Sequence, residues 1–277
     1  MKLFEVPGHA SSLLPDGYEF ELVWSDEFDG NALDTSKWDY RLTMMGKRHA
    51  AWTDKGVKLE NGCAVFSIFE DNGEIVSPQL QTGYNFMDEP VKPTNFGSEF
   101  LQWPIGKLKE SKFTHKYGYY ECRCRLQKKN GWRSAFWIQS PNIGSTLDPK
   151  LSGSEVDIME SFYPGEIHHH NVFTGGYGQD MKREKVGGFE VEPNDEFHTF
   201  GLLWTEDGYV FYVDGKEDGR IDKYVSDVPQ FILISTETTG YRMEDHRPVK
   251  EAYEAAAAKD SFVVDHVRVF DVKKQSI

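Results

Sequence analysis

Hydrophobic and polar residues alternate over short stretches along most of the chain. The stretches YGYYECRCRL (117–126), RSAFWIQS (133–140) and EVDIMESF (155–162) are rich in aromatic and β-branched residues, and turn-forming residues separate them. Alternation with a period of two, punctuated by Gly, Pro, Asn and Asp, predicts β-strands. Similar stretches lie at 167–176, 198–216, 230–237 and 261–272.

The signals between these strands complete an all-β interpretation. Residues 206–208 and 214–215 predict two hairpin turns, and the alanine-rich stretch 249–259 predicts one short helix. The polar stretch 71–107 predicts long loops. No internal repeat or linker divides the chain. The pattern therefore predicts one β-sandwich of two antiparallel sheets, with residues 1–277 as a single domain, 1–20 as an N-terminal extension and about 21–273 as the core.

The composition limits the classes of binding partner more than it limits the fold class. Lys and Arg number 31 against 45 Asp and Glu, which gives a net charge of −14. So acidic a chain is poorly suited to hold nucleic acid or an anionic membrane by bulk attraction. We expect no membrane span, because no apolar run approaches about 18 residues. The localisation stays open: a removed signal peptide implies an extracellular or periplasmic protein, and a native Met1 implies a cytoplasmic one.

The three cysteines predict neither a disulfide framework nor a metal site. Cys122 and Cys124 are two positions apart on a predicted strand and share a face, while Cys63 is remote in sequence. No second Cys or His pair completes a set of ligands. We interpret these residues as small buried hydrophobes.

The stretch GSEVDIMESFYP (153–164) carries the candidate chemistry. In a regular strand Glu155 and Asp157 share one face, but Glu160 falls on the opposite face among apolar side chains. A β-bulge near Ile158 and Met159 would return Glu160 to the face of the other two acids. The two glutamates would then be about 13 Å apart at Cα. Their carboxyls could approach to about 5 Å, the separation typical of a retaining glycosidase.

The residues alone leave three interpretations of this acidic cluster. The first is catalysis, in which crowding separates the pKa values and Asp157 shares a proton or a hydrogen bond with Glu155, so that one glutamate stays ionised while Glu160 stays protonated. The second is a Ca²⁺ site, although such sites usually draw their ligands from a curved loop. The third is an ordinary solvated acidic strand.

The motif GSEVDIMES resembles the ExDxxE signature of glycoside hydrolase family 16, the laminarinase, agarase and carrageenase group. Four more stretches are similar to the family in the same order: LVWSDEFDGNALDTSKW, KFTHKYGYYECRCRL with GWRSAFWIQS, FHTFGLLWTEDGYVFYVDGK and SFVVDHVRVFD. The resemblance implies a curved β-jelly-roll sandwich with an open cleft on its concave face. It also implies Glu155 as nucleophile, Glu160 as general acid/base and Asp157 as the assisting acid between them.

A cleft for sugars needs aromatic platforms and hydrogen-bonding groups. We expect Trp132, Trp137, Trp52 and Trp103 to be platforms, and Trp24 and Trp38 to be core residues. Trp204 fits either environment.

One position departs from the family pattern, because Arg133 occupies a slot where relatives usually have Trp. By alternation Arg133 shares a face with Trp137 and could bind sugar hydroxyls or an acidic substituent. A shift in register would place Trp132 there instead. In the stretch IHHHNVFTGG, His169 and Asn171 share a face and are candidates to hold substrate near Glu160.

The resemblance adds cleft-edge and metal candidates. Glu237 and Arg242 in STETTGYR are candidates for the edge of the cleft. Many members of the family carry a structural Ca²⁺ on the convex face, and Asp265 with the carbonyl of Gly62 matches that position. The resemblance implies no cofactor for catalysis itself.

The sequence therefore predicts an enzyme, a monomeric retaining endo-glycoside hydrolase acting on a polysaccharide or oligosaccharide. We expect a β-1,3- or mixed β-1,3/1,4-glucan as substrate. The alternative is a β-galactan, of the agar, porphyran, carrageenan or mucin poly-lactosamine kind. A non-catalytic glycan-binding domain is a further alternative, disfavoured because all three acids are present. Transglycosylation through the same intermediate also stays open.

Overall fold

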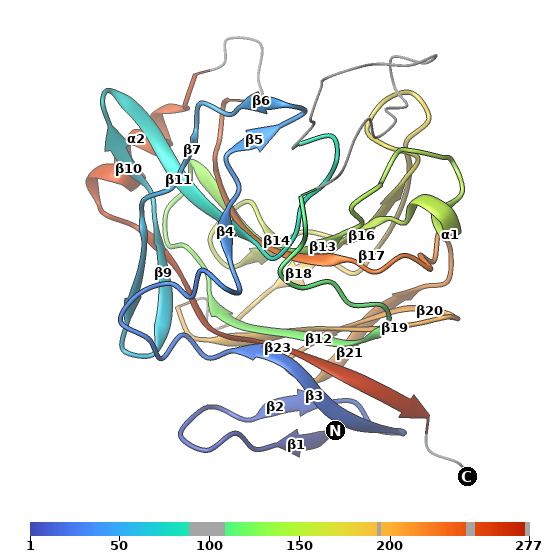
Figure 1. Ribbon diagram of the computed structural model, residues 1–277. Helices are drawn as coiled ribbons and strands as arrows, with labels where there is room; N and C mark the ends of the chain where they lie inside the picture. Colours follow the sequence, from blue (N-terminus) through green and yellow to red (C-terminus); the bar gives the residue numbers. More distant parts are fainter. Residues whose placement is uncertain (89–108, 193–194, 242–246, 275–277) are drawn as a thin grey trace.

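The computed structural model describes residues 1–88, 109–192, 195–241 and 247–274. Strands dominate it, and two large sheets stack face to face as a β-jelly-roll sandwich (Figure 1). Two short helices, α1 (Pro149–Ser152) and α2 (Lys250–Ala257), lie outside the sheets. The predicted fold class is confirmed. Within the described residues, no helix has the length and apolar character needed to cross a bilayer.

The cleft sheet, as we name the sheet that carries the candidate acids, has seven strands in its main path and two short strands at β11. All pairings are antiparallel except that of β7 with β11. The order is β10 (Phe69–Asp71), β11 (Glu74–Gln81), β22 (Phe231–Thr238), β13 (Trp132–Gln139), β14 (Glu155–Ser161), β16 (His170–Thr174) and β17 (Lys182–Val186), with β4 (Asp39–Tyr40) and β7 (Trp52–Thr53) beside β11.

The outer sheet lies behind the cleft sheet and is antiparallel throughout. Its order is β21 (Lys216–Ile221), β20 (Gly208–Val213), β19 (His198–Thr205), β12 (Gly118–Arg125), β23 (Ser261–Lys274), β9 (Cys63–Ser67) and β8 (Val57–Glu60), with β3 (Tyr18–Asp26) paired to β23. Three two-stranded pairs complete the fold: β1 (Lys2–Phe4) with β2 (Ser12–Leu14), β5 (Thr43–Met44) with β6 (Lys47–Arg48), and β15 (Glu166–Ile167) with β18 (Phe189–Glu190).

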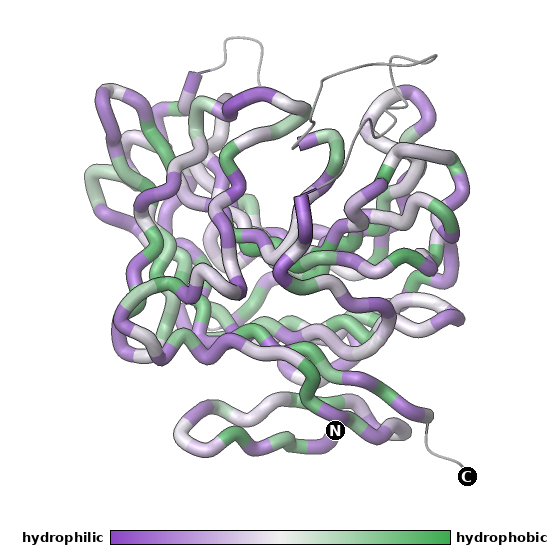
Figure 2. The backbone as a smooth tube through the Cα atoms, viewed as in Figure 1, coloured by the Kyte–Doolittle hydropathy of each residue, from purple (hydrophilic) through white to green (hydrophobic). Residues whose placement is uncertain are grey.

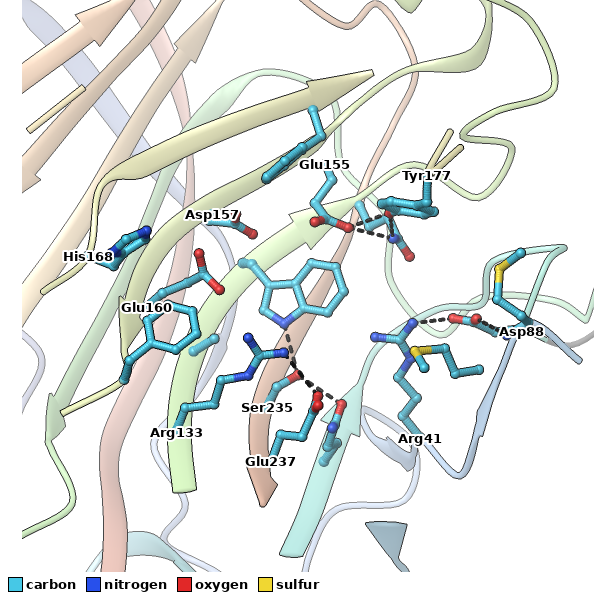
Figure 3. Close-up of a pocket in the computed structure, with 18 of the residues that line it drawn as sticks. Arg41, Asp88, Arg133, Glu155, Asp157, Glu160, His168, Tyr177, Ser235 and Glu237 are labelled. Atoms are coloured by element: carbon cyan, nitrogen blue, oxygen red, sulfur yellow. Dashed lines mark hydrogen bonds and ion pairs between the residues drawn. The ribbon is translucent and has the colours of Figure 1, made fainter. Parts of the chain in front are cut away.

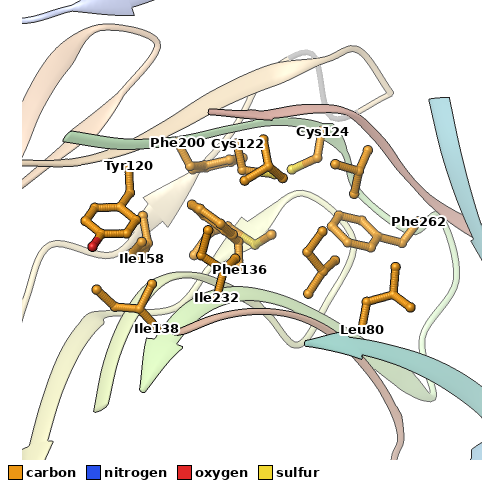
Figure 4. Packing of buried hydrophobic residues seen from close by; sticks show 14 of the residues in the cluster. Leu80, Tyr120, Cys122, Cys124, Phe136, Ile138, Ile158, Phe200, Ile232 and Phe262 are labelled. Carbon is orange, nitrogen blue, oxygen red and sulfur yellow. The ribbon is translucent and has the colours of Figure 1, made fainter. Parts of the chain in front are cut away.

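The main core fills the space between the two sheets. Hydrophobic and hydrophilic positions alternate along the strands (Figure 2). Because alternate side chains point to opposite faces, each sheet presents an apolar face to the other, and these faces form one buried cluster. Phe136 and Ile158 of the cleft sheet meet Cys122 and Phe200 of the outer sheet in one fully buried cluster (Figure 4). Burial of Cys122 and Cys124 confirms their interpretation as core residues, and Cys63 is half-buried.

The N-terminal extension packs on the far face of the outer sheet. Strands β1 and β2 form a hairpin whose Phe4 contacts Phe270 edge-on at 5.1 Å between ring centroids. Beneath it the buried Glu121 accepts a hydrogen bond from the Leu13 backbone amide at 2.8 Å, and the guanidinium of Arg268 donates to Ser12. The extension is therefore folded against the outer sheet and covers buried charges.

Most predicted elements are confirmed, and two are wrong. The helix at 249–259 and both hairpin turns after 205 and 213 occur as expected. The prediction of long loops over 71–107 is wrong for Glu74–Gln81, which form β11, a strand whose residues after Glu74 are all buried. The prediction took the polar residues of β11 as exposed. Polar side chains such as Gln79 can be buried because they are hydrogen-bonded, here from Gln79 Nε2 to the Thr236 carbonyl. Residues 89–107 of the predicted loop region lie outside the described residues. The stretch 167–176 is also interrupted, since His168 and His169 lie between strands β15 and β16.

Candidate active site

A cleft with a volume of about 570 Å³ lies over the face of the cleft sheet that points away from the core (Figure 3). All three candidate acids line it, together with aromatic, cationic and amide side chains that suit a glycan. The lining residues are Arg41, Met44, Met45, Gln79, Asp88, Arg133, Ala135, Trp137, Gln139, Glu155, Asp157, Glu160, Phe162, His168, Phe173, Tyr177, Arg183, Ser235 and Glu237.

The bulge predicted in β14 is confirmed. Met159 pairs with Phe136 of β13, and Asp157 pairs with the next residue, Trp137, so Ile158 is the extra residue. Ile158 and Met159 are both fully buried in the core. The bulge therefore absorbs one residue on the core side and leaves Glu160 on the cleft side.

A buried histidine holds the bulge from behind. The Nδ1 atom of His170 lies 2.7 Å from the carbonyl oxygen of Ile158, and its Nε2 atom lies 3.2 Å from the carboxylate of Asp218 on β21. The imidazole stacks on Phe211 of β20 with 4.5 Å between ring centroids. His170 thus joins the bulge in the cleft sheet to two strands of the outer sheet.

Glu155 is held by two donors that meet on one oxygen. Gln139 Nε2 donates to Glu155 Oε2 at 2.9 Å, and the hydroxyl of Tyr177 donates to the same oxygen (Figure 3). Burial raises the pKa of Glu155, and the hydrogen bond from Tyr177 partly offsets this rise. The negative charge of Glu160 raises the pKa further, while the Arg41 guanidinium lowers it.

Asp157 sits between the two glutamates and is 5% exposed. Burial, with the neighbouring charges of Glu160 and Glu155, raises its pKa well above the usual range. Asn171 Nδ2 donates to Glu160 Oε2 at 3.0 Å and is itself fixed by Arg183, whose Nε donates to the Asn171 amide oxygen at 2.8 Å. The hydrogen bond of Asp157 runs to Glu160, whereas the sequence predicts Glu155 as its partner. A raised pKa favours the protonated form of Asp157, which can donate to a neighbouring carboxylate.

Asp157→Asn should test this protonation state through stability. Since the pKa of Asp157 is higher in the folded than in the unfolded chain, the folded chain binds more protons and stability falls as pH rises above the unfolded value. We expect Asp157→Asn to be more stable than the wild type at pH 7, by about 0.5–2 kcal/mol, and similar to it near pH 3. Urea unfolding at both values measures this. Equal stability at pH 7 would show that Asp157 is ionised.

Three further predicted cleft residues, Arg133, Trp137 and Glu237, line the cleft as expected. Arg133 faces the cleft and donates from Nη2 to Glu237 Oε2 at 3.1 Å. The Trp137 indole donates from Nε1 to the hydroxyl of Ser235 at 2.8 Å. Asn171 is fully buried just below the lining and acts on the cleft through Glu160.

Besides Asn171, three predicted cleft residues do not line the cleft. Trp132 is fully buried on the core side, where its Nε1 donates to Asp260 Oδ2 at 2.9 Å, so the alternative register is excluded. Trp52 is also buried and lies behind Arg41, with the guanidinium carbon 5.1 Å from the ring centroid. The break in the strand after residue 167 turns the His169 ring toward the Gly187 carbonyl and leaves His168 at the cleft.

Among the remaining candidates, Trp103 and Arg242 lie outside the described residues. Trp24, Trp38 and Trp204 pack with the core. The sequence interpretation missed several lining residues, notably Arg41, Tyr177 and His168.

The calcium candidate Asp265 already has cationic partners, and the role of the Gly62 carbonyl stays a prediction. The carboxylate of Asp265 is paired with Arg123 Nη1 at 2.7 Å and lies 3.4 Å from His266 Nδ1. Burial opposes ionisation of Asp265, but the hydrogen bonds from His266 and Arg123 outweigh it and lower its pKa. No cluster of three or more His, Cys, Asp or Glu in the described ranges is arranged to hold a metal. A guanidinium in place of a metal ligand makes this position unsuited to Ca²⁺.

We therefore expect a chelator to leave the stability supported by Asp265 unchanged. EDTA at millimolar concentration should shift the melting temperature by less than about 1 °C, because Arg123 already neutralises the carboxylate. Differential scanning fluorimetry with EDTA, and with added CaCl₂, measures this. A marked stabilisation by CaCl₂ that Asp265→Asn removes would contradict it.

Three carboxylates on one bulged strand, at the floor of a cleft in a two-sheet jelly-roll, define a carbohydrate-active β-sandwich. The profile of the family described as "Beta-porphyranase A-D, GH16 domain" matches residues 20–272. The chain therefore belongs to glycoside hydrolase family 16, in the group defined by that domain.

Individual relatives have low sequence identity to this chain, but the matches cover most of its length. The glucan endo-1,3-β-glucosidase A1 of Niallia circulans is 24% identical over 204 residues, which cover 70% of this chain and 28% of that enzyme. The β-porphyranase B of Phocaeicola plebeius is 25% identical over 276 residues, covering 86% of this chain and 80% of that enzyme. The laminarinase structure from Flavobacterium sp. UMI-01 has a TM-score of 0.62 at 21% identity, covering 91% of this chain and all of that one. This chain thus spans less than a third of the Niallia enzyme.

Proposed function

We propose that the protein is an endo-acting, retaining β-glycoside hydrolase of polysaccharides. The observation that carries the proposal is the bulge at Ile158, through which Glu155 and Glu160 both line the cleft with Asp157 between them. Membership of glycoside hydrolase family 16 supports it. An open cleft formed by many strands suits an internal segment of a long chain.

In the proposed reaction Glu155 attacks the anomeric carbon, and the glycosidic C–O bond breaks. The bonding electrons pass to the leaving oxygen, which takes a proton from Glu160. Water then gives a proton to Glu160 and attacks the same carbon, and the ester bond to Glu155 breaks with net retention. Asp157 supports Glu160 through their hydrogen bond. The approach of about 5 Å between the two glutamate carboxyls stays a prediction.

The substrate has two candidates on this site. A β-1,3- or mixed β-1,3/1,4-glucan is supported by likeness to named glucanases, and a β-galactan is supported by the porphyranase domain profile over residues 20–272. The profile favours the galactan. Arg133 and Arg41 are each paired with a cleft carboxylate, of Glu237 and Asp88 respectively. Recognition of an acidic substituent by either arginine would therefore compete with an existing ion pair.

Hydrolysis of a polysaccharide panel tests the proposal. The panel contains laminarin, mixed-linkage glucan, agarose, porphyran, carrageenan and mucin glycans, with the Glu155→Gln/Glu160→Gln double variant as control. We expect oligosaccharide products of mixed length from at least one polymer, with retained anomeric configuration by NMR. Product analysis also separates hydrolysis from transglycosylation, and size-exclusion chromatography tests the expected monomer. Folded protein inactive on the whole panel would count against the enzyme.

A further inference from the structure

Tyr177 reaches the candidate nucleophile from a loop that the established family motif does not include. It lies between β16 and β17, and its side chain is 40% exposed at the rim of the cleft. Gly175 and Gly176 before it have φ angles of +78° and +80°, a left-handed conformation that favours glycine. An ideal Cβ on Gly144 would lie 3.0 Å from the Gly176 Cα, so the two loops are closely packed. The tyrosine is thus presented by a defined turn.

The hydrogen bonds of Glu155 are one-sided. Both Tyr177 and Gln139 donate to Oε2, and Gln139 also contacts the Tyr177 hydroxyl. Among the described residues, no side-chain donor to Oε1 accompanies them. The two oxygens of Glu155 therefore have different environments before any sugar binds.

We propose that Tyr177 is a positioning residue that holds Oε2 of Glu155, so that Oε1 is the atom that bonds to the anomeric carbon. This inference rests on the proposed function. In the glycosyl–enzyme ester Oε2 becomes the carbonyl oxygen and accepts more weakly than a carboxylate. When water displaces the ester, the C–Oε1 electrons return to the carboxylate and the Tyr177 hydrogen bond strengthens again. Tyr177 therefore promotes release of the sugar more than its attachment.

The same bond also sets the charge state of the nucleophile. The Tyr177 hydroxyl donates to the ionised form of Glu155 and lowers its pKa against the effect of burial. Loss of the hydroxyl should therefore raise the pKa of Glu155. The acidic limb of the pH profile would move to higher pH by about one unit, the expected effect of one hydrogen bond to a charged group.

Tyr177→Phe tests the proposal, with Tyr253→Phe on α2 as the matched control and Tyr177→Ala as a second variant. In the absence of substrate, ¹³C NMR of Glu-labelled protein follows the Glu155 carboxyl, whose signal is assigned by its loss in Glu155→Gln. We expect a higher pKa in both Tyr177 variants and no change in Tyr253→Phe. An unchanged pKa would overturn the proposal whether or not any polysaccharide is cut.

Kinetics supply the second measurement, on an aryl β-oligosaccharide prepared from the polysaccharide that the wild type cuts. In Tyr177→Phe, kcat should fall about 10-fold with a lower KM and a burst of aryl alcohol, because the intermediate accumulates. Equal falls in kcat and kcat/KM without a burst would overturn the role in sugar release. If the NMR shift occurs but the wild type cuts no polysaccharide, the proposed function is wrong, and the role of Tyr177 in sugar release is wrong as well.

Discussion

Glu155→Gln should bind the polysaccharide and fail to cut it. The amide cannot attack the anomeric carbon, and we expect kcat to fall by roughly 10⁴–10⁶-fold. Because Gln keeps the shape of the side chain, the hydrogen bond with Gln139 can be replaced and the fold retained. Turnover follows from reducing-end release, and binding from affinity electrophoresis in a gel containing the polymer.

Glu160→Gln is the matched variant on the same strand. Its loss in kcat should be smaller, about 10²–10⁴-fold on the polysaccharide, and smaller still on an aryl glycoside whose leaving group needs no proton. Azide should restore turnover as the β-glycosyl azide in a Glu160 variant only. If Glu160→Gln lost activity equally on both substrates, the assigned role in proton transfer would be wrong.

Trp132→Ala should destabilise the protein and leave substrate binding almost unchanged. The indole is fully buried between the sheets and hydrogen-bonded to Asp260, so its removal leaves a cavity and takes one hydrogen bond from a buried carboxylate. We expect a loss of about 3–5 kcal/mol in the free energy of unfolding. Guanidinium titration at 25 °C measures it, and the KM of the folded fraction should stay within about twofold of the wild type.

Trp137→Ala is the control, because it lies on the same strand with the opposite orientation. Trp137 lines the cleft and lies 5.2 Å from the Arg41 guanidinium carbon. Loss of this platform should raise KM about 10-fold with a smaller loss of stability. If the two variants exchanged these effects, the orientation of β13 would be contradicted.

The candidate acids were predictable from sequence because the sequence of this one strand already shows that Glu160 would fall on the apolar face. Val156 and Glu160 sit an even number of positions apart, so they share a face in any regular strand. One inserted residue is the smallest change that separates them, and Ile158 is that residue. The all-β class was equally accessible, because it depends on many strands rather than on any one.

The remaining site residues depend on distant partners that local pattern does not contain. Trp132 donates a hydrogen bond to Asp260, and Arg133 donates one to Glu237. Both partners are more than 100 residues away in the sequence. His168 reached the cleft because the chain leaves its strand there, which reverses the faces assigned by alternation. Tyr177 lies in a glycine-rich turn whose direction is set by packing against another loop.

Because His170 stacks on Phe211, the geometry of the bulge in β14 depends on the outer sheet as well as on the cleft sheet. Strand β21, which carries Asp218, is an edge strand of the outer sheet, and its Gly219 lies against Val186 at the edge of the cleft sheet. Local opening is easiest where few buried apolar contacts hold the backbone, and an edge strand has a neighbour on one side only. Local fraying there would release the Ile158 carbonyl while the core stays intact. Heat should therefore inactivate the enzyme reversibly, a few degrees before the sandwich itself melts.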